Sequence, residues 1–436
     1  MIPNGLRRRS FLGVVGATAG AAWLAACHKD EAASSGSSPA SGNKTVTWWN
    51  IANTDPLLTV WAKLAREFEA GHPGVKINIT PLENEAFKAK LTTVTQAGNP
   101  PDLFHSWGGG VLEQQVEAGL VKELSGDSAS FLSLLPQNGV KLYQVGGKQY
   151  GVPYELGMVG FWYNKELFAK AGVSQPPQTW AELLGVVRQL KAAKLVPIAL
   201  AGGDKWPAHF YWSYLAIRQG GVAAMAEAAK TGAFDGPDFV TAGAKLAELV
   251  ALDPFQPGFL GAKYMASDGQ SAIMGNGQAA MELMGQWAPS IEAAYSTDKK
   301  GIGDKLGFFA FPALDGGKGS SNDVLGGCNG YAVGKNAPPE ALEFLKFLLS
   351  PSSQRTVARE GGVLPLAAGA EDALTDPNLK LVHAALAQAT GFQLYLDQAY
   401  PPAIGQQVND SVAALVAKSA SPQAVAQAIA KTAKSL

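Results

Sequence analysis

The residues of this chain with the clearest chemical potential are aromatic rings that stand beside planar polar groups. Ten Trp and eleven Tyr occur in 436 residues. Trp49-Asn50 and Ser106-Trp107 each follow a short β-rich run, and Glu155 follows an expected hinge. A flat ring can pack on an apolar face of a small molecule, while an amide or carboxylate pairs with its hydroxyl groups. A surface ion pair is the alternative for Glu155, and core packing is the alternative for both tryptophans.

A denser aromatic group lies between residues 206 and 212. Trp206, His209 and Trp212 are spaced three apart, so they can share a helical face. This spacing is equally compatible with stacking on a ligand and with packing in a core. Tyr395, in an aromatic and polar patch near the C-terminus, is a further candidate, with a plain helix surface as its alternative.

The sequence does not favour several other kinds of site. Five His are scattered without metal-ligand spacing, and no HExxH, CxxC or EF-hand pattern occurs. The sequence also lacks GxSxG and GxxxxGK[ST], which supply a nucleophile or a phosphate cradle. We therefore expect no catalytic residues, no metal and no cofactor. With 35 Lys and Arg against 36 Asp and Glu, there is no basic excess that would indicate nucleic acid as a partner.

The N-terminus has the pattern of an export signal. The segment RRRSFL (7–12) resembles a twin-arginine signal, and the apolar run that follows is too short to favour a permanent membrane span. LAAC (24–27) resembles the lipobox of bacterial lipoproteins, whose cleavage leaves a lipidated cysteine. We expect a signal peptide over 1–27, a lipid on Cys27, and a flexible linker over the Ser- and Gly-rich residues 28–43. A buried N-terminal helix with a packed thiol is the alternative.

The rest of the chain alternates between strand-like and helix-like segments. Strand patterns at 45–49 and 75–79 flank an amphipathic helix at 57–69, which is a βαβ unit and implies a parallel pair. The alternation recurs, and Thr179 and Glu182 fit a capping box at the start of another helix. We therefore expect an α/β protein with chain crossings near 150–153 and 310–312.

The order of the motifs resembles family 1 of the extracellular solute-binding proteins, the sugar-binding receptors of ABC importers. The matching pieces are GNPPDLF (98–104), YGVPY (150–154), WYNKELF (162–168), PQTWAEL (177–183), AAME (279–282) and Gly326-Gly327. The resemblance implies a periplasmic-binding-protein-like fold of the class II type. Each of its two lobes would have a mixed sheet flanked by helices, and hinge segments would join the lobes. Lobe 1 is expected to comprise 44–152 plus 311–360, and lobe 2 to comprise 153–310 plus 361–436.

The resemblance also adds ligand contacts to those expected from the residues themselves. The family places contacts on the turn that holds Gln286 and Trp287. Gly326 and Gly327 form a glycine-rich turn whose backbone N–H groups can approach a ligand closely.

The resulting expectation is a monomeric, lipid-anchored receptor at the outer face of the cytoplasmic membrane. It would close on a sugar, a di- or oligosaccharide, and deliver it to the permease subunits of an ABC transporter without chemical change. Two alternatives remain at this point. One is a secreted carbohydrate-active enzyme, which needs two opposed carboxylates. The other is a receptor for a phosphorylated polyol, which needs a basic cluster.

Overall fold

The computed structural model describes residues 44–133 and 135–436. The expected signal peptide, the linker and Cys27 lie outside these residues. Within the described part, no helix combines the length and the apolar character that a membrane span requires.

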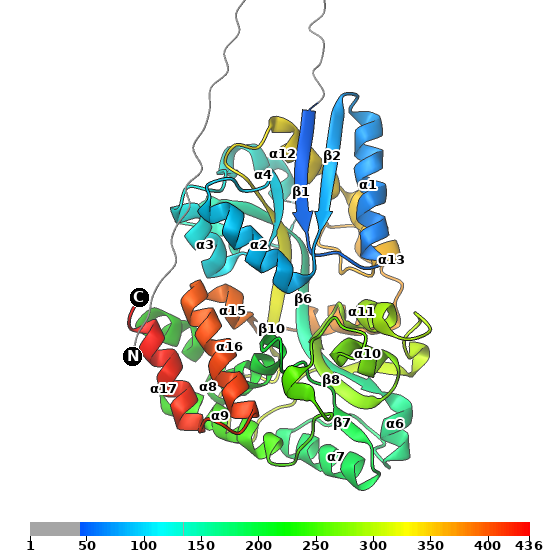
Figure 1. Cartoon of the computed structure of the whole chain (residues 1–436), viewed down its shortest axis with the longest axis vertical. Coiled ribbons are helices and arrows are strands. Elements are labelled where there is room, and N and C mark those ends of the chain that lie inside the picture. Colours follow the sequence, from blue (N-terminus) through cyan, green and yellow to red (C-terminus); the bar gives the residue numbers. More distant parts are fainter. Residues whose placement is uncertain (1–43, 134) are drawn as a thin grey trace, which may run out of the picture. The chain divides into compact units, whose positions relative to one another are not determined.

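The α/β class expected from the sequence is confirmed, with one mixed sheet and helices against it (Figure 1). The strands are β1 (Lys44–Asn50), β2 (Val75–Pro81), β3 (Leu103–Ser106), β4 (Gln144–Val145), β5 (Lys148–Gln149), β6 (Gly151–Asn164), β7 (Val196–Ile198), β8 (Ala279–Gly285), β9 (Leu306–Phe309), β10 (Asp323–Val333) and β11 (Gly391–Leu394). The main path of the sheet runs β2-β1-β3-β10-β6-β8-β7, with β11 beside β10 and β9 beside β6, while β4 and β5 form a separate small ribbon.

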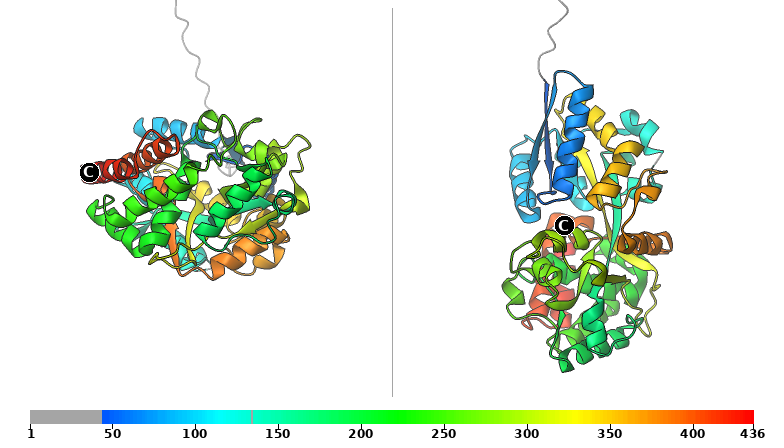
Figure 2. Two further views of the ribbon diagram at one scale, coloured as in Figure 1. Left: turned by 90° about the horizontal axis from the view of Figure 1, so that it is seen from below. Right: turned by 90° about the vertical axis from the view of Figure 1, so that its right-hand side faces the viewer.

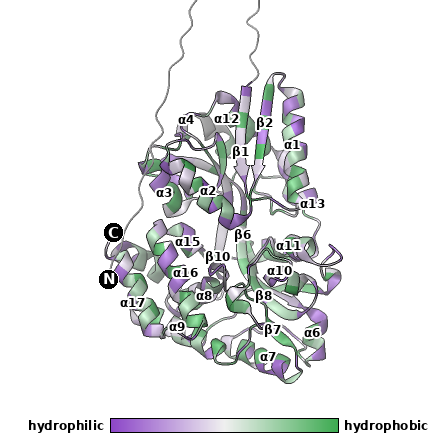
Figure 3. Ribbon diagram, in the orientation of Figure 1, coloured by the Kyte–Doolittle hydropathy of each residue, from purple (hydrophilic) through white to green (hydrophobic). Residues whose placement is uncertain are grey.

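The helices cover this sheet and extend beyond it. They are α1 (Leu57–Gly71), α2 (Asn84–Gln96), α3 (Gly109–Glu117), α4 (Ser125–Leu132), α5 (Gln137–Lys141), α6 (Lys165–Lys170), α7 (Trp180–Ala192), α8 (Trp206–Thr231), α9 (Pro237–Val250), α10 (Gln270–Gly275), α11 (Ala288–Tyr295), α12 (Pro339–Leu348), α13 (Pro351–Gly361), α14 (Pro377–Ala387), α15 (Leu396–Ala399), α16 (Pro402–Val416) and α17 (Pro422–Ala433). Outer helices such as α1 carry both hydrophilic and hydrophobic residues, as their half-buried position requires (Figure 3).

The first βαβ unit forms as the periodicity predicts. β1 and β2 pair in parallel, with Trp48 opposite Ile79, and α1 connects them. The helix buries an apolar stripe that includes Trp61, and the Trp61 ring packs edge-on against Trp48 with centroids 5.5 Å apart. This burial fixes the C-terminal end of β1 and therefore the loop that follows it.

The body consists of two lobes (Figure 2), and the three largest hydrophobic clusters lie in one lobe or the other. The lobe 1 core contains Trp48, Trp61 and Phe344, with a smaller cluster around Phe87 and Phe104 beside it. The core of lobe 2 is larger and collects residues from α7, α8, α9, β8, α16 and α17. The long strands β6 and β10 run through both lobes and pair with each other antiparallel.

Core packing shows where the chain passes between the lobes. The first passage lies in β6, where Tyr154 belongs to the lobe 1 core and Met158 to the lobe 2 core. The third passage along the chain lies at Val363-Leu364, since Val363 belongs to the lobe 1 core and Leu364 to the lobe 2 core. The expected passage near 310–312 differs from the structure, in which Phe311 belongs to lobe 2. The Phe311 ring stacks on Tyr214, with centroids 4.5 Å apart, so the second passage comes later, within β10.

Candidate functional site: a cleft between the lobes

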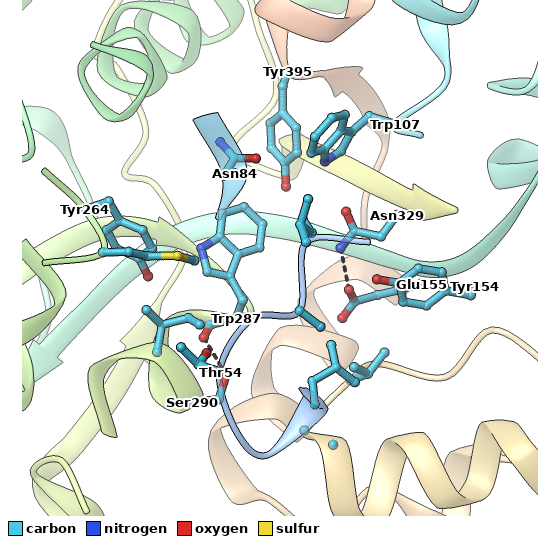
Figure 4. A pocket seen from close by; sticks show the side chains of 18 of the residues that line it. Thr54, Asn84, Trp107, Tyr154, Glu155, Tyr264, Trp287, Ser290, Asn329 and Tyr395 are labelled. Atoms are coloured by element: carbon cyan, nitrogen blue, oxygen red, sulfur yellow. Dashed lines mark hydrogen bonds between the residues drawn. The ribbon is translucent and has the colours of Figure 1, made fainter. Parts of the chain in front are cut away.

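A cavity lies where the two lobes face each other, and residues of both lobes and of the passages line it (Figure 4). Its empty space, including the part open to solvent, is about 1020 Å³. The lining comprises Ile51, Ala52, Thr54, Asp55, Pro56, Leu57, Asn84, Lys88, Trp107, Tyr154, Glu155, Trp206, Phe210, Tyr264, Met265, Trp287, Ser290, Ile291, Asn329, Gly361, Gly362, Val363, Tyr395, Asp397 and Gln398.

Aromatic rings from both lobes form much of the cavity wall. Trp107 follows β3 and packs against the cores of both lobes. Trp287 immediately precedes α11, and its ring meets Tyr395 edge-on with centroids 6.0 Å apart. Trp206, at the start of α8, meets Tyr264 in the same manner at 5.4 Å. The wall therefore offers several flat apolar surfaces in different orientations, and ring-shaped ligands can stack on such surfaces.

Glu155 lines the cavity and connects the segments that pass between the lobes. Its Oε2 accepts a hydrogen bond of 2.6 Å from Nδ2 of Asn329 on β10. Its Oε1 accepts one of 3.2 Å from the N–H of Leu364 at the third passage. Burial raises the pKa of Glu155 above its ordinary value, while the amides of Asn329 and Gln286 and the N–H of Leu364 lower it in part.

An ion pair crosses the cavity from lobe 1 to lobe 2. Nζ of Lys88 on α2 lies 3.4 Å from Oδ2 of Asp397 on α15. Burial alone would lower the pKa of Lys88, but Asp397 and Glu85 raise it above its ordinary value. Burial would raise the pKa of Asp397, but Lys88, His209 and Gln398 lower it. Both groups are therefore charged at neutral pH and compensate each other.

The hydroxyl of Tyr395 gives the cavity a further polar group. Within the described part of the chain, this buried oxygen has no hydrogen-bond partner. A buried polar group without a partner is costly, and a ligand hydroxyl could supply the missing bond.

Five of the residues expected from the sequence meet at this cavity: Trp107, Glu155, Trp206, Trp287 and Tyr395. They come from the loop after β3, from β6, from α8, from the β8–α11 turn and from the segment after β11, so only the fold brings them together.

The other candidates of lobe 1 lie outside the lining. The Trp49 ring contacts Nζ of Lys90 at 4.7 Å instead. The Asn50 side chain accepts a hydrogen bond of 3.0 Å from the N–H of Ala52, and Ser106 Oγ accepts one of 3.1 Å from Gly108. These two polar side chains hold the loops after β1 and β3.

His209 and Trp212 also lie outside the lining. Nδ1 of His209 is 2.9 Å from Oδ1 of Asn409, and Trp212 is wholly buried with its ring stacked on Phe239. A helix turns by about 100° per residue, so Trp212 is rotated by about 120° from Trp206. The spacing of three therefore spreads these side chains over different faces of α8.

Gly326 and Gly327 do not form the expected turn, since both lie within strand β10, where they pair with β6. Protein side chains cover these glycines, and Gln286 likewise lies outside the cavity lining. The Gln286 side chain packs on Gly157, where an added Cβ would lie 1.8 Å from Oε1 of Gln286. The Tyr395 ring covers Gly327 in the same way, with a ring carbon 1.9 Å from the Cβ position. The glycines thus allow protein side chains to approach closely.

Sequence reasoning missed much of the lobe 1 wall. The loop after β1 contributes Ile51, Thr54 and Pro56, and α2 contributes Asn84 and Lys88. The available signal was the position of this loop at the carboxyl end of a parallel strand, where open α/β sheets place ligands. Asn329 had a weaker signal, as the polar residue of the glycine-rich run GGCNG (326–330).

Comparisons with known proteins agree with this architecture. The profile of the family described as "Bacterial extracellular solute-binding protein" matches residues 52–355. The multiple sugar-binding protein of Streptococcus mutans is 27% identical over 355 residues, which cover 78% of each chain. The diacetylchitobiose binding protein DasA of Streptomyces coelicolor is 25% identical over 364 residues, or 82% of each chain.

Two solved structures are similar over almost their whole length. A chitin oligosaccharide binding protein has a TM-score of 0.83 at 28% identity, covering 90% of this chain and 99% of that one. A protein from a study of xylan utilization by Caldanaerobius polysaccharolyticus has a TM-score of 0.82 at 28% identity, covering 89% and 99%. With a two-lobed α/β body and a family match that spans most of it, this chain belongs to the bacterial extracellular solute-binding protein family.

Proposed function

We propose that this protein binds a sugar of two or more units between its lobes and delivers it unchanged to the permease of an ABC importer. The observation that carries the proposal is the cavity itself, in which Trp107 and Trp287 stand beside the polar pair of Glu155 and Asn329. A pyranose has apolar C–H faces that suit an indole and hydroxyl groups that suit a carboxylate and an amide. The names of the relatives and of the similar structures, which mention sugars and oligosaccharides, support the same ligand class.

The charges around the cavity favour a neutral sugar over a phosphorylated polyol. Lys88 is the one basic residue in the described lining, and it is paired with Asp397. Asp55 and Glu155 add carboxylates to the same lining. A phosphate group would need several free donors with positive charge, which these residues do not supply.

The same carboxylates favour a receptor over a glycosidase. Glu155 is engaged by Asn329 and Leu364, and Asp397 is engaged by Lys88. Glu282, a further candidate acid, is wholly buried in lobe 2 and does not line the cavity. A glycosidase needs one carboxyl group as an acid and a second as a base or nucleophile across the scissile bond. These fixed carboxylates suit binding without turnover.

The N-terminal sequence and the family support a proposal for export and attachment. The family is extracellular, which supports an exported protein. We propose in addition that a lipid on Cys27 attaches it to the outer face of the cytoplasmic membrane, and that it meets its permease there as a monomer. The variant Cys27→Ser should move the protein from the membrane fraction to the soluble extracellular fraction. An unchanged distribution would contradict the anchor.

A titration with defined sugars tests the binding function. The full chain is mixed with diacetylchitobiose, raffinose, maltose and xylotriose, and with glucose 6-phosphate and glucuronate as anionic controls, and heat is recorded by calorimetry. We expect saturable binding of at least one neutral oligosaccharide and a matching rise of the melting temperature, because a ligand that binds only the folded state stabilises it. Chromatography of the same mixtures should show unaltered sugar. Product formation, or binding of the anionic controls alone, would overturn the proposal.

A further inference from the structure

The lobes also meet outside the cavity, where α3 begins. Gly109 and Gly110 of lobe 1 lie directly against the backbone of lobe 2. A Cβ atom on Gly110 would lie 2.4 Å from the carbonyl carbon of Tyr400 and 2.7 Å from the nitrogen of Pro401. A Cβ atom on Gly109 would lie 2.5 Å from the carbonyl oxygen of Gln398. Since real side chains do not approach so closely, this contact requires glycine.

Each side of this contact is fixed to its own lobe. In lobe 1, Leu112 of α3 is buried beside Phe87, and the N–H of Gly109 donates to the carbonyl of Leu142 at 2.9 Å. In lobe 2, the Tyr400 ring meets Phe234 with centroids 5.4 Å apart. The contact is therefore made between lobes, and a relative movement of the lobes must change it.

The ion pair of Lys88 and Asp397 lies beside this contact and also joins the lobes. Asp397 is the residue before Gln398, and its side chain is only 11% exposed. Lys88 lies one helix turn from Glu85, whose Oε1 is 3.2 Å from Nζ of Lys88. A partly buried ion pair contributes more to stability than an exposed ion pair does. The close backbone approach at the glycines gives shape complementarity between the lobes, and the ion pair adds electrostatic attraction. Both act on the same short segment.

We infer that these two contacts form a latch, which sets how completely the lobes close and thereby sets ligand affinity. The inference rests on the proposed function and extends it to Gly109, Gly110 and Tyr400, which do not line the cavity, whereas Lys88 and Asp397 do. A ligand that binds only the closed arrangement loses affinity in proportion to any fall in the population of that arrangement. Gly110 and Tyr400 would then control affinity without touching the sugar.

The variant Gly110→Ala tests the latch. Gly110 lies in the first turn of α3 and its φ is not in the left-handed region, so alanine suits the helix of the separate lobe. The three atoms nearest to the added methyl group would all belong to lobe 2. Gly185→Ala is the matched control, because Gly185 lies within α7 and its Cβ position has no neighbour within 4 Å.

The readout is the distance between the lobes, with and without sugar. Spin labels are attached through unnatural amino acids at the exposed positions Glu113 on α3 and Ala251 after α9 of the full chain. Distances are measured without ligand and with diacetylchitobiose, raffinose, maltose or xylotriose. We expect the unsubstituted protein to show the distance of the closed arrangement in at least one condition. Gly110→Ala should reduce that population and raise the Kd of any bound sugar by about tenfold, and Gly185→Ala should change neither.

The ion pair gives a second arm that does not depend on the folding of Gly110→Ala. Lys88→Glu and Asp397→Lys should each reduce the closed population, and the double exchange should restore it in part. An unsubstituted protein that never shows the closed distance would overturn the latch, as would equal closure in Gly110→Ala and Gly185→Ala. If no sugar binds but the closed population still falls in Gly110→Ala, the latch stands and the sugar-binding proposal fails.

Discussion

The carboxylate of Glu155 on β6 accepts a hydrogen bond of 2.6 Å from the amide of Asn329 on β10, and this bond joins the two strands that connect the lobes. The N–H of Leu364 adds the third passage to the same carboxylate. One buried side chain thus touches every segment between the lobes and also lines the cavity. A ligand that contacts Glu155 would therefore act on a residue that is bonded to all the segments between the lobes.

Removing the amide partner of this carboxylate should destabilise the protein. Asn329→Ala leaves Oε2 of Glu155 buried without its donor, and an unsatisfied buried acceptor costs about 1–3 kcal/mol. We expect a fall of this size in the free energy of unfolding, measured by urea denaturation, together with weaker sugar binding. Asn138→Ala is the control, because the Asn138 side chain accepts a local hydrogen bond of 2.9 Å from the neighbouring N–H of Gly139. Equal stability of both variants would contradict the role of Asn329.

Loss of either cavity indole should weaken sugar binding without unfolding the protein. A stacked ring contributes about 0.5–1.5 kcal/mol, so Trp287→Ala and Trp107→Ala should each raise Kd by about two- to tenfold. Calorimetry with a bound neutral oligosaccharide measures the change. Trp49→Ala is the matched control, because that ring lies against Lys90 outside the lining. Unchanged affinity in both cavity variants would refute their assignment.

Two buried acids behind Trp287 should make the stability of lobe 2 depend on pH. Burial raises the pKa of Glu282 to about 7, although Glu292 and Gln270 lower it in part. Burial and the neighbouring Glu282 raise the pKa of Glu292 well above its ordinary value. The folded state therefore holds protons that the unfolded state releases near pH 4.5. The contribution of these two groups to stability should be greatest below that pH. It should fall as the pH rises to about 7.

Glu282→Gln tests this pH dependence, because the amide imitates the protonated acid. We expect the free energy of unfolding of the variant to exceed that of the unsubstituted protein by about 1–3 kcal/mol at pH 8 and to match it near pH 4.5. Urea denaturation across this range measures the difference, and Tyr211 and Tyr264 are the other titratable groups near Glu282. Glu227→Gln, at an exposed position on α8, should leave the pH profile unchanged. A steeper profile in Glu282→Gln would contradict the assignment.

Arg218 should be essential for the stability of lobe 2. Its guanidinium is almost wholly buried and donates to backbone carbonyls over 311–323, which are those of Phe311, Pro312, Ser320, Ser321 and Asp323. Arg218→Met would leave these acceptors unpaired. We therefore expect the free energy of unfolding, measured by urea denaturation, to fall by at least about 3 kcal/mol. Arg218→Lys should not restore it, because an ammonium group cannot reproduce the planar fork. Stability close to that of the unsubstituted protein would contradict this role.

The same arginine explains why one lobe boundary could not be predicted. The sequence places a strand near 307–311 and suggests a passage between lobes there. The contacts of Phe311 with Tyr214, and of the following backbone with Arg218, hold this segment on lobe 2. Partners about 100 residues apart decide the outcome, and no local pattern reports them.

Sequence patterns predicted the structure correctly where it depends on residues that are close together in the chain. The capping box at α7 forms in part, since Thr179 Oγ1 accepts from the N–H of Glu182 at 3.2 Å. Glu182 Oε2 reaches the N–H of Gln178 at 2.7 Å rather than that of the cap residue. The βαβ start, the α/β class and the family could all be predicted, because periodicity and motif order act over short stretches of chain.

Sequence by itself determined which elements form and which kind of ligand chemistry the chain can offer. Only the tertiary structure decided which of many aromatic rings face the cavity, such as Trp107 rather than Trp49 and Trp206 rather than Trp212. The reason is that burial depends on helix rotation and on neighbours distant in sequence, which residue type and spacing do not encode.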